Sequence, residues 1–243
     1  MSNGDLGWIT NFIWGIADDV LRDLYVRGKY RDVILPMTVL RRLDAVLEPT
    51  KKAVLDMKAR LDKERITNQD AALRQAAGQD FYNTSKFTLR DLRARASQQQ
   101  LKADFEAYLD GFSPNVQDIL DKFEFRNQMP RLSKADALGT LIEKFLDPSV
   151  NLSPYPVKNS DGSIKYPGLD NHAMGTIFEE LVRRFNEENN EEAGEHWTPR
   201  DAVKLTPEPC PRSSECQFST LASGEGGNFL TLRSVDFVIH KAV

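Results

Sequence analysis

The chain has 243 residues, of which 40% are hydrophobic and 28% are charged, as in an ordinary globular protein. Its net charge of −4 argues against a surface that is basic throughout, although a local basic patch remains compatible with it. No apolar run approaches the roughly 18 residues of a membrane span, and no basic leader opens the sequence, so we expect a cytoplasmic protein. Cys210 and Cys216 lack nearby histidines or further cysteines, so we predict free thiols and no metal site.

Helical periodicity dominates the first two hundred residues. Apolar side chains recur at spacings of three and four over residues 9–24, which predicts a helix that ends before Gly28. A second helical pattern covers residues 30–47, and Pro36 within it either starts the helix or kinks it. Residues 51–65 are charged and prone to form a helix, which we expect to face solvent.

Shorter patterns predict further helices at residues 89–96, 99–112, 114–123 and 134–146. The segment at 147–170 is rich in proline, glycine, serine and asparagine, so it is predicted to be a loop or a domain linker. A strong helical pattern follows at 174–185, and an acidic loop follows it at 186–195. Little strand signal precedes residue 205.

The composition changes after Leu205. The last segment contains both cysteines, several prolines and few charges, and only residues 229–232 and 235–239 resemble short strands. A frameshift, a pseudogene remnant or a new C-terminus could each produce this change.

Three ordered segments carry unusual combinations of residues. Residues 14–54 contain the runs WGIAD, KYRD and ILPMTVLRRLD, residues 81–92 read FYNTSKFTLRDL, and residues 175–203 end in GEHWTPRDAV. Together they resemble the modification (methyltransferase) subunit of type I restriction-modification systems. The resemblance implies a mainly α fold, with a helical N-terminal domain followed by the truncated start of a Rossmann-like α/β methyltransferase domain. The implied boundaries are 1–150 for the helical domain, 151–170 for a linker, 171–204 for the opening helices of the methyltransferase domain and 205–243 for an aberrant tail.

The resemblance also implies a cofactor contact. In the resembling enzymes, the segment that corresponds to residues 195–200 touches S-adenosylmethionine. The implied cofactor-binding residues are Glu195, His196, Trp197, Thr198, Pro199 and Arg200. The alternative is a plain helix start, with Thr198 as the N-cap and Pro199 at the first helical position.

Basic side chains gather around the second predicted helix. Lysine and arginine neutralise phosphates without reading sequence, so these residues are candidates for contact with the DNA backbone. The candidates are Arg27, Lys29, Arg31, Arg41 and Arg42. The alternatives are a solvated face, because acidic residues interleave, and a surface that packs against the specificity subunit. In the same way, Asp44 and Asp91 could be surface acids, and Ser85 or Thr88 could cap the helix that begins near Leu89.

The function implied by the resemblance is transfer of a methyl group from S-adenosylmethionine to adenine N6 in double-stranded DNA. The implied complex has two modification subunits and one specificity subunit, and a restriction subunit joins it for DNA cleavage. No membrane partner is implied. The 243 residues contain no Asn-Pro and no Pro-Pro pair, and residues 224–227 (GEGG) are a weak match to a cofactor loop. We therefore assign no catalytic residue and expect the chain to be inactive alone. Two alternatives are a non-catalytic helical module that binds the specificity subunit and DNA, and a fragment that aggregates through an apolar face.

Overall fold

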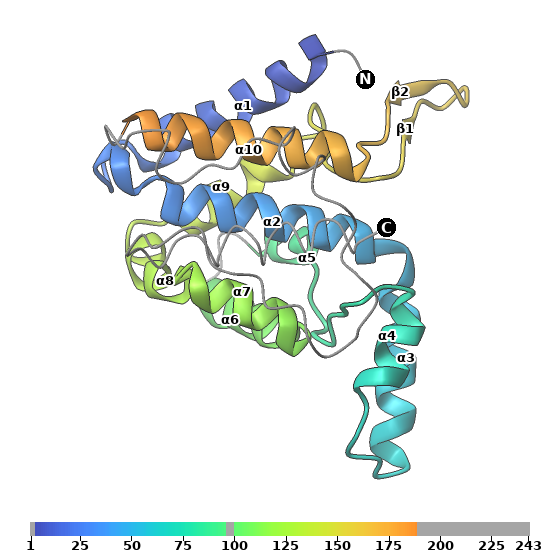
Figure 1. Ribbon diagram of the computed structural model, residues 1–243. Helices are drawn as coiled ribbons and strands as arrows, with labels where there is room; N and C mark the ends of the chain where they lie inside the picture. The colour runs from blue at the N-terminus through green and yellow to red at the C-terminus, as the bar shows by residue number, and fades with distance from the viewer. Residues whose placement is uncertain (1–2, 96–99, 189–243) are drawn as a thin grey trace, which may run out of the picture.

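The computed structural model describes residues 3–95 and 100–188, which form an assembly of helices with one small sheet (Figure 1). The helices are α1 (Asn3–Leu21), the 3-10 turn η1 (Arg27–Lys29), α2 (Arg31–Leu47), the 3-10 turn η2 (Glu48–Thr50), α3 (Lys51–Lys63), α4 (Asp70–Ala77), α5 (Leu89–Arg93), α6 (Leu101–Asp110), α7 (Pro114–Lys122), α8 (Phe125–Lys134), α9 (Ala137–Phe145) and α10 (Asn171–Glu188). Strands β1 (Val157–Lys158) and β2 (Ile164–Tyr166) lie between α9 and α10. The mainly α fold is confirmed. The start of a Rossmann-like domain stays a prediction.

Helix α2 runs through the centre of the molecule. Thirteen of its residues are buried, and α1, α8, α9 and α10 all pack against it. A helix that is apolar on nearly all sides must be covered on nearly all sides, which explains this position. Pro36 lies inside α2 and is buried, so it does not start the helix.

Helix α10 completes the core beside α1. Its apolar stripe, which includes Ile177, Phe178 and Leu181, is buried in the same hydrophobic cluster as α1 and α2. The ring of Trp14 on α1 lies 4.8 Å from the ring of Phe185 on α10. The helix predicted at 174–185 is thus confirmed. The domain boundaries drawn on either side of 151–170 stay a prediction.

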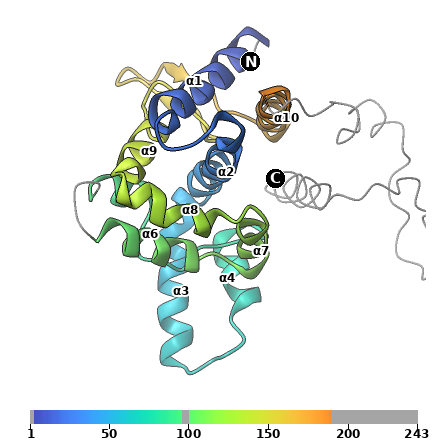
Figure 2. The ribbon, with the colours of Figure 1, turned by 90° about the vertical axis from the view of Figure 1, so that its left-hand side faces the viewer.

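Helices α3 and α4 form a hairpin that extends away from the other helices (Figures 1 and 2). Val54 and Leu61 of α3 are buried, as is Leu73 of α4, and the two helices pack against each other. The prediction that residues 51–65 face solvent is therefore correct for only part of the helix. Helix α4 ends where Gly78 takes a left-handed conformation (φ 64°), which glycine adopts without steric cost.

The segment at 147–170 contains a small two-stranded sheet between α9 and α10. Its strands, of two and three residues, pair antiparallel with Val157 opposite Tyr166, and they are the only strands of the described residues, in keeping with the weak strand signal before residue 205. The amide of Asn151 donates hydrogen bonds to the carbonyl oxygens of Tyr155 (2.9 Å) and Pro167 (3.0 Å), which joins the two sides of the hairpin base. Leu169 is buried. Within the described ranges, no helix is both long and apolar enough to cross a bilayer.

Helix α5 begins with a capping box. The Thr88 hydroxyl accepts the backbone N–H of Asp91, and the Asp91 carboxylate accepts the backbone N–H of Thr88 (2.9 Å). We expect Thr88→Ala to lower the free energy of unfolding by about 1 kcal/mol, because the free N–H groups of the first turn lose their acceptor. Urea denaturation of the full chain measures the change. Thr88→Ser keeps the hydroxyl and should restore most of the stability, so equal losses in both variants would contradict this origin.

Candidate functional site

The buried centre of the molecule contains the guanidinium of Arg42, which is only 2% exposed. It donates hydrogen bonds to the carbonyl oxygens of Leu152 and Leu169, both at 2.8 Å, and to Oδ1 of Asn171 at 2.7 Å. Burial lowers the pKa of Arg42 to about 10, so the side chain remains cationic at neutral pH. Arg42 of α2 therefore fixes both ends of the hairpin segment and the start of α10.

Arg41 is partly buried. Its Nε donates to the carbonyl oxygen of Phe145 at the end of α9 (3.2 Å), and burial lowers its pKa. Arg42 is buried and Arg41 is partly buried, and each has a partner inside the protein, whereas their contact with DNA stays a prediction. The sequence alone does not distinguish Arg41 and Arg42 from exposed arginines. Their partners lie in residues 145–171, more than a hundred positions away in the chain.

The other three predicted DNA contacts lie at the surface, around the start of α2. The side chains of Arg27 and Lys29 are each 63% exposed, and that of Arg31 is 26% exposed. Arg27 lies 3.8 Å from a carboxylate oxygen of Glu188, and Lys29 lies 3.5 Å from one of Asp32. Within the predicted basic set, Arg42 is therefore the buried member, Arg31 and Arg41 are partly buried, and Arg27 and Lys29 are the most exposed.

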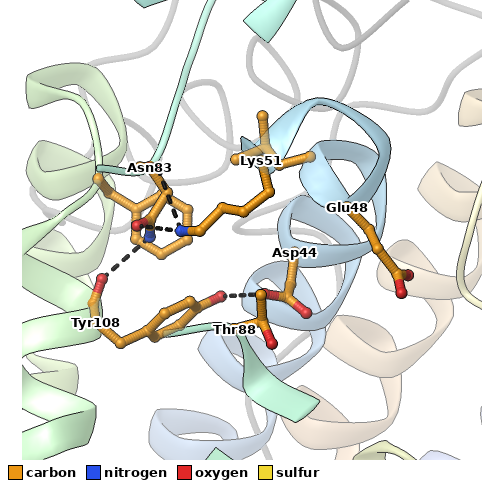
Figure 3. A pocket seen from close by; sticks show the side chains of 8 residues that line it. Asp44, Glu48, Lys51, Asn83, Thr88 and Tyr108 are labelled. Atoms are coloured by element: carbon orange, nitrogen blue, oxygen red, sulfur yellow. Dashed lines mark hydrogen bonds between the residues drawn. The ribbon is translucent and has the colours of Figure 1, made fainter. Parts of the chain in front are cut away.

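A buried polar cluster joins α2 to α3, α5 and α6 (Figure 3). The Tyr108 hydroxyl and the backbone N–H of Leu89 both donate to Oδ1 of Asp44, at 3.0 and 3.2 Å. Lys51 Nζ donates to the Oδ1 and to the carbonyl oxygen of Asn83, at 3.0 and 3.2 Å. Asp44 is consequently not the surface acid considered above.

Burial dominates the electrostatics of this cluster. It raises the pKa of Asp44, lowers the pKa of Lys51 to about 8 and raises the pKa of Tyr108 well above 10. Each shift disfavours the charged form, as expected for groups removed from water. The opposite charges of Asp44 and Lys51 offset part of that cost, because each lowers the energy of the other's charged form.

The FYNTSKFTL element serves to build this cluster. Asn83 Oδ1 accepts the N–H of Ser85 (2.8 Å), and its Nδ2 donates to the carbonyl oxygen of Tyr108 (3.1 Å). The Ser85 hydroxyl in turn accepts the N–H of Phe87 (3.2 Å). A side chain at Gly111 would collide with Ser85 and Asn83, so the close approach of this loop to the end of α6 requires glycine there.

The polar cluster is too small to hold a substrate. The cavity beside it offers about 10 Å³, which is at most the space of one water molecule. Sequence reasoning missed the cluster, because nothing in the spacing of residues 44, 51, 83 and 108 shows that they meet. The available signals were the acid within a buried apolar helix and the Asn-x-Ser loop pattern, and both are compatible with a purely structural role.

A second, open hollow lies between α1 and the end of α10. It measures about 470 Å³ and is lined by Trp14, Arg184, Glu187 and Glu188. Its three charged side chains already have partners within the protein, and Trp14 packs on Phe185. This hollow is therefore not assigned to S-adenosylmethionine, which needs unpaired polar groups around an enclosed pocket.

The predicted cofactor-binding residues Glu195 to Arg200 lie outside the described residues, so their contact stays a prediction. Among residues 3–95 and 100–188, no group of three or more histidines, cysteines or acids is placed to hold a metal ion.

One comparison with known proteins gave a match. A family model described as "HsdM N-terminal domain" matches residues 9–145, which is more than half of the chain. The matched range extends from within α1 to the last residue of α9 and includes both the Arg41–Arg42 pair and the Asp44 cluster. Comparisons with curated proteins and with solved structures gave no significant match.

Replacement of Arg42 tests its internal role. Arg42→Met keeps much of the side-chain volume but leaves the carbonyl groups of Leu152 and Leu169 without a donor. We expect a loss of about 2–4 kcal/mol in the free energy of unfolding, because unsatisfied buried acceptors are costly. Urea denaturation measures it, and Arg22→Met on the exposed surface should change stability by less than about 0.5 kcal/mol. Similar small effects in both variants would contradict the assignment.

The lowered pKa of Lys51 predicts a pH dependence. Between about pH 8 and the usual lysine value of 10.5, the unfolded chain binds more protons at this position than the folded chain does. The free energy of unfolding therefore gains a contribution that rises with pH through this window. Tyr108, whose pKa is raised, acts oppositely above about pH 10, so the test is confined to pH 8–10.

The measurement compares urea denaturation of the wild type and of Lys51→Met at several pH values. The wild type should gain stability relative to the variant as the pH rises from 8 to 10. Parallel pH profiles for the two proteins would show that Lys51 titrates as an ordinary exposed lysine.

Proposed function

Because the chain belongs to the family of the HsdM N-terminal domain, we propose that it is the helical domain of a modification subunit that serves adenine-N6 methylation in DNA. The family match over residues 9–145 carries this proposal, and it agrees with the resemblance to type I restriction-modification systems. The proposed partners are a second modification subunit, a specificity subunit, a restriction subunit and double-stranded DNA, and the proposed location is the cytoplasm.

We assign the described part of the chain a role in binding and positioning. Arg27, Lys29 and Arg31 are the proposed contacts with the DNA backbone, since lysine and arginine gain affinity for phosphates through release of counterions. The ion pairs of Arg27 with Glu188 and of Lys29 with Asp32 compete with this contact. Each of the three residues should therefore make a modest contribution to the affinity for DNA, and this contribution should be larger at low salt.

The methyl group would come from S-adenosylmethionine, and residues 195–200 are the proposed contact with it. Pro199 suits the first turn of a helix, whose free N–H groups favour a carboxylate. Methylation of adenine also needs a pocket for the base outside the duplex. The Asn-Pro-Pro-aromatic element that lines this pocket in the resembling enzymes is absent from the 243 residues, so we propose that this chain does not transfer methyl groups by itself.

The alternative is a non-catalytic helical module that binds the specificity subunit and DNA. One observation favours it: the family match is to the N-terminal domain alone and ends at residue 145, before the proposed cofactor contact. The two candidates differ in whether residues 195–200 bind S-adenosylmethionine.

A three-part experiment on the full chain tests the proposal. We expect the chain to co-elute with a type I specificity subunit in size-exclusion chromatography and to show no transfer of labelled methyl groups to adenine. Titration calorimetry with S-adenosylmethionine then separates the candidates, because heat of binding that Trp197→Ala abolishes supports the cofactor contact. Co-elution without cofactor binding supports the module. Labelled adenine, or failure to co-elute, would contradict the proposal.

A further inference from the structure

The α3–α4 hairpin, residues 51–77, is hereafter called the arm. It extends from the body of helices in both views (Figures 1 and 2). Helices α3 and α4 pack mainly on each other, and the principal contact of α3 with the remaining elements is with the turn η2 at its base. The outward faces of the arm are therefore available to a partner.

The arm is basic although the chain is acidic. It carries seven lysines and arginines and four acids, whereas the whole chain has a net charge of −4. Lys58 pairs with Asp62 (2.6 Å) and Arg74 with Asp70 (2.7 Å), which neutralises these four residues locally. The acids left on the arm are Asp56 and Glu64.

Of the five other cations, Lys51 belongs to the polar cluster at the base of the arm, and the remaining four are exposed. Lys52, Arg60 and Lys63 are exposed on α3, and Arg65 is exposed at the tip. Lys52 and Lys63 are eleven residues apart, close to three helical turns, so they share one face at a separation of about 16 Å along the axis. In the part of the chain that the structure describes, neither of these two lysines forms an ion pair. Their charges are thus free to meet phosphates, and Asp56 lies on the same face between them.

We propose that the arm binds the backbone of double-stranded DNA through Lys52, Arg60 and Lys63. This contact is separate from that of Arg27 to Arg31, because the 17 residues of α2 place the two ends of that helix about 25 Å apart. The choice of DNA as the partner of the arm rests on the proposed function. Phosphate neutralisation gives affinity without sequence choice, which suits a subunit whose target is selected elsewhere in the complex.

The test uses fluorescence anisotropy of a labelled 20-base-pair duplex titrated with the full chain between 50 and 200 mM KCl. The triple variant Lys52→Gln, Arg60→Gln and Lys63→Gln should bind on the order of tenfold more weakly at the lowest salt concentration. The slope of log affinity against log salt should become shallower by about 2.7, since each phosphate contact contributes about 0.9. Asp56→Asn removes a repelling carboxylate from the same face and should strengthen binding.

A matched control changes the net charge by the same amount elsewhere. The triple variant Lys134→Gln, Lys158→Gln and Lys165→Gln alters exposed lysines on α8 and on the β1–β2 hairpin. It should keep the affinity and the slope of the wild type. Equal losses in the two triple variants would show an effect of overall charge and would overturn the assignment to the arm.

A third triple variant, Arg27→Gln, Lys29→Gln and Arg31→Gln, separates the two proposals. If only this variant loses affinity, the arm proposal fails and the proposed contact at the start of α2 stands. If the wild type binds no DNA, both DNA contacts fail, whereas co-elution with the specificity subunit still tests the remaining function. If the duplex binds the wild type and the arm variant equally, whereas polyglutamate binds the wild type but not the arm variant, the arm binds an acidic protein surface, and the DNA assignment is overturned.

Discussion

The burial of charged side chains on α2 is the constraint on which the rest of the structure depends. A guanidinium removed from water is costly unless its N–H groups find acceptors. Arg42 finds three, and all belong to the segment between residues 152 and 171. Arg42 therefore ties the central helix to that segment, which also contributes the buried Leu152 and Leu169 to the core.

Asp44, on the opposite side of α2, also needs hydrogen-bond partners because its carboxylate is removed from water. Its Oδ1 accepts the Leu89 N–H and the Tyr108 hydroxyl, so one carboxylate oxygen fixes both the start of α5 and a residue of α6. Directional hydrogen bonds select one arrangement. Arg42 and Asp44, which are two residues apart on α2, thus connect the central helix to segments on two of its sides.

The helices were largely predictable, whereas the site was not. Strong 3.6-residue periodicity reveals α1, α2 and α10, because each buries a continuous apolar stripe. Helices α4 and α8 were missed: the first is only eight residues long, and the second contains Pro130. The β1–β2 hairpin was missed because its strands of two and three residues, exposed apart from the partly buried Tyr166, show no alternation.

The sequence does not show whether a charged side chain will be buried or exposed. Arg27 and Arg42 are the same residue type in the same basic run, and only tertiary contacts make one a surface cation and the other a buried connector. The match to the family ends at Phe145, but the hydrophobic core does not. Without α10, the apolar faces of α1 and α2 that meet Ile177, Phe178 and Phe185 would contact water, and Arg42 would lose the acceptor on Asn171. The physical unit that holds the matched residues in place therefore includes helix α10.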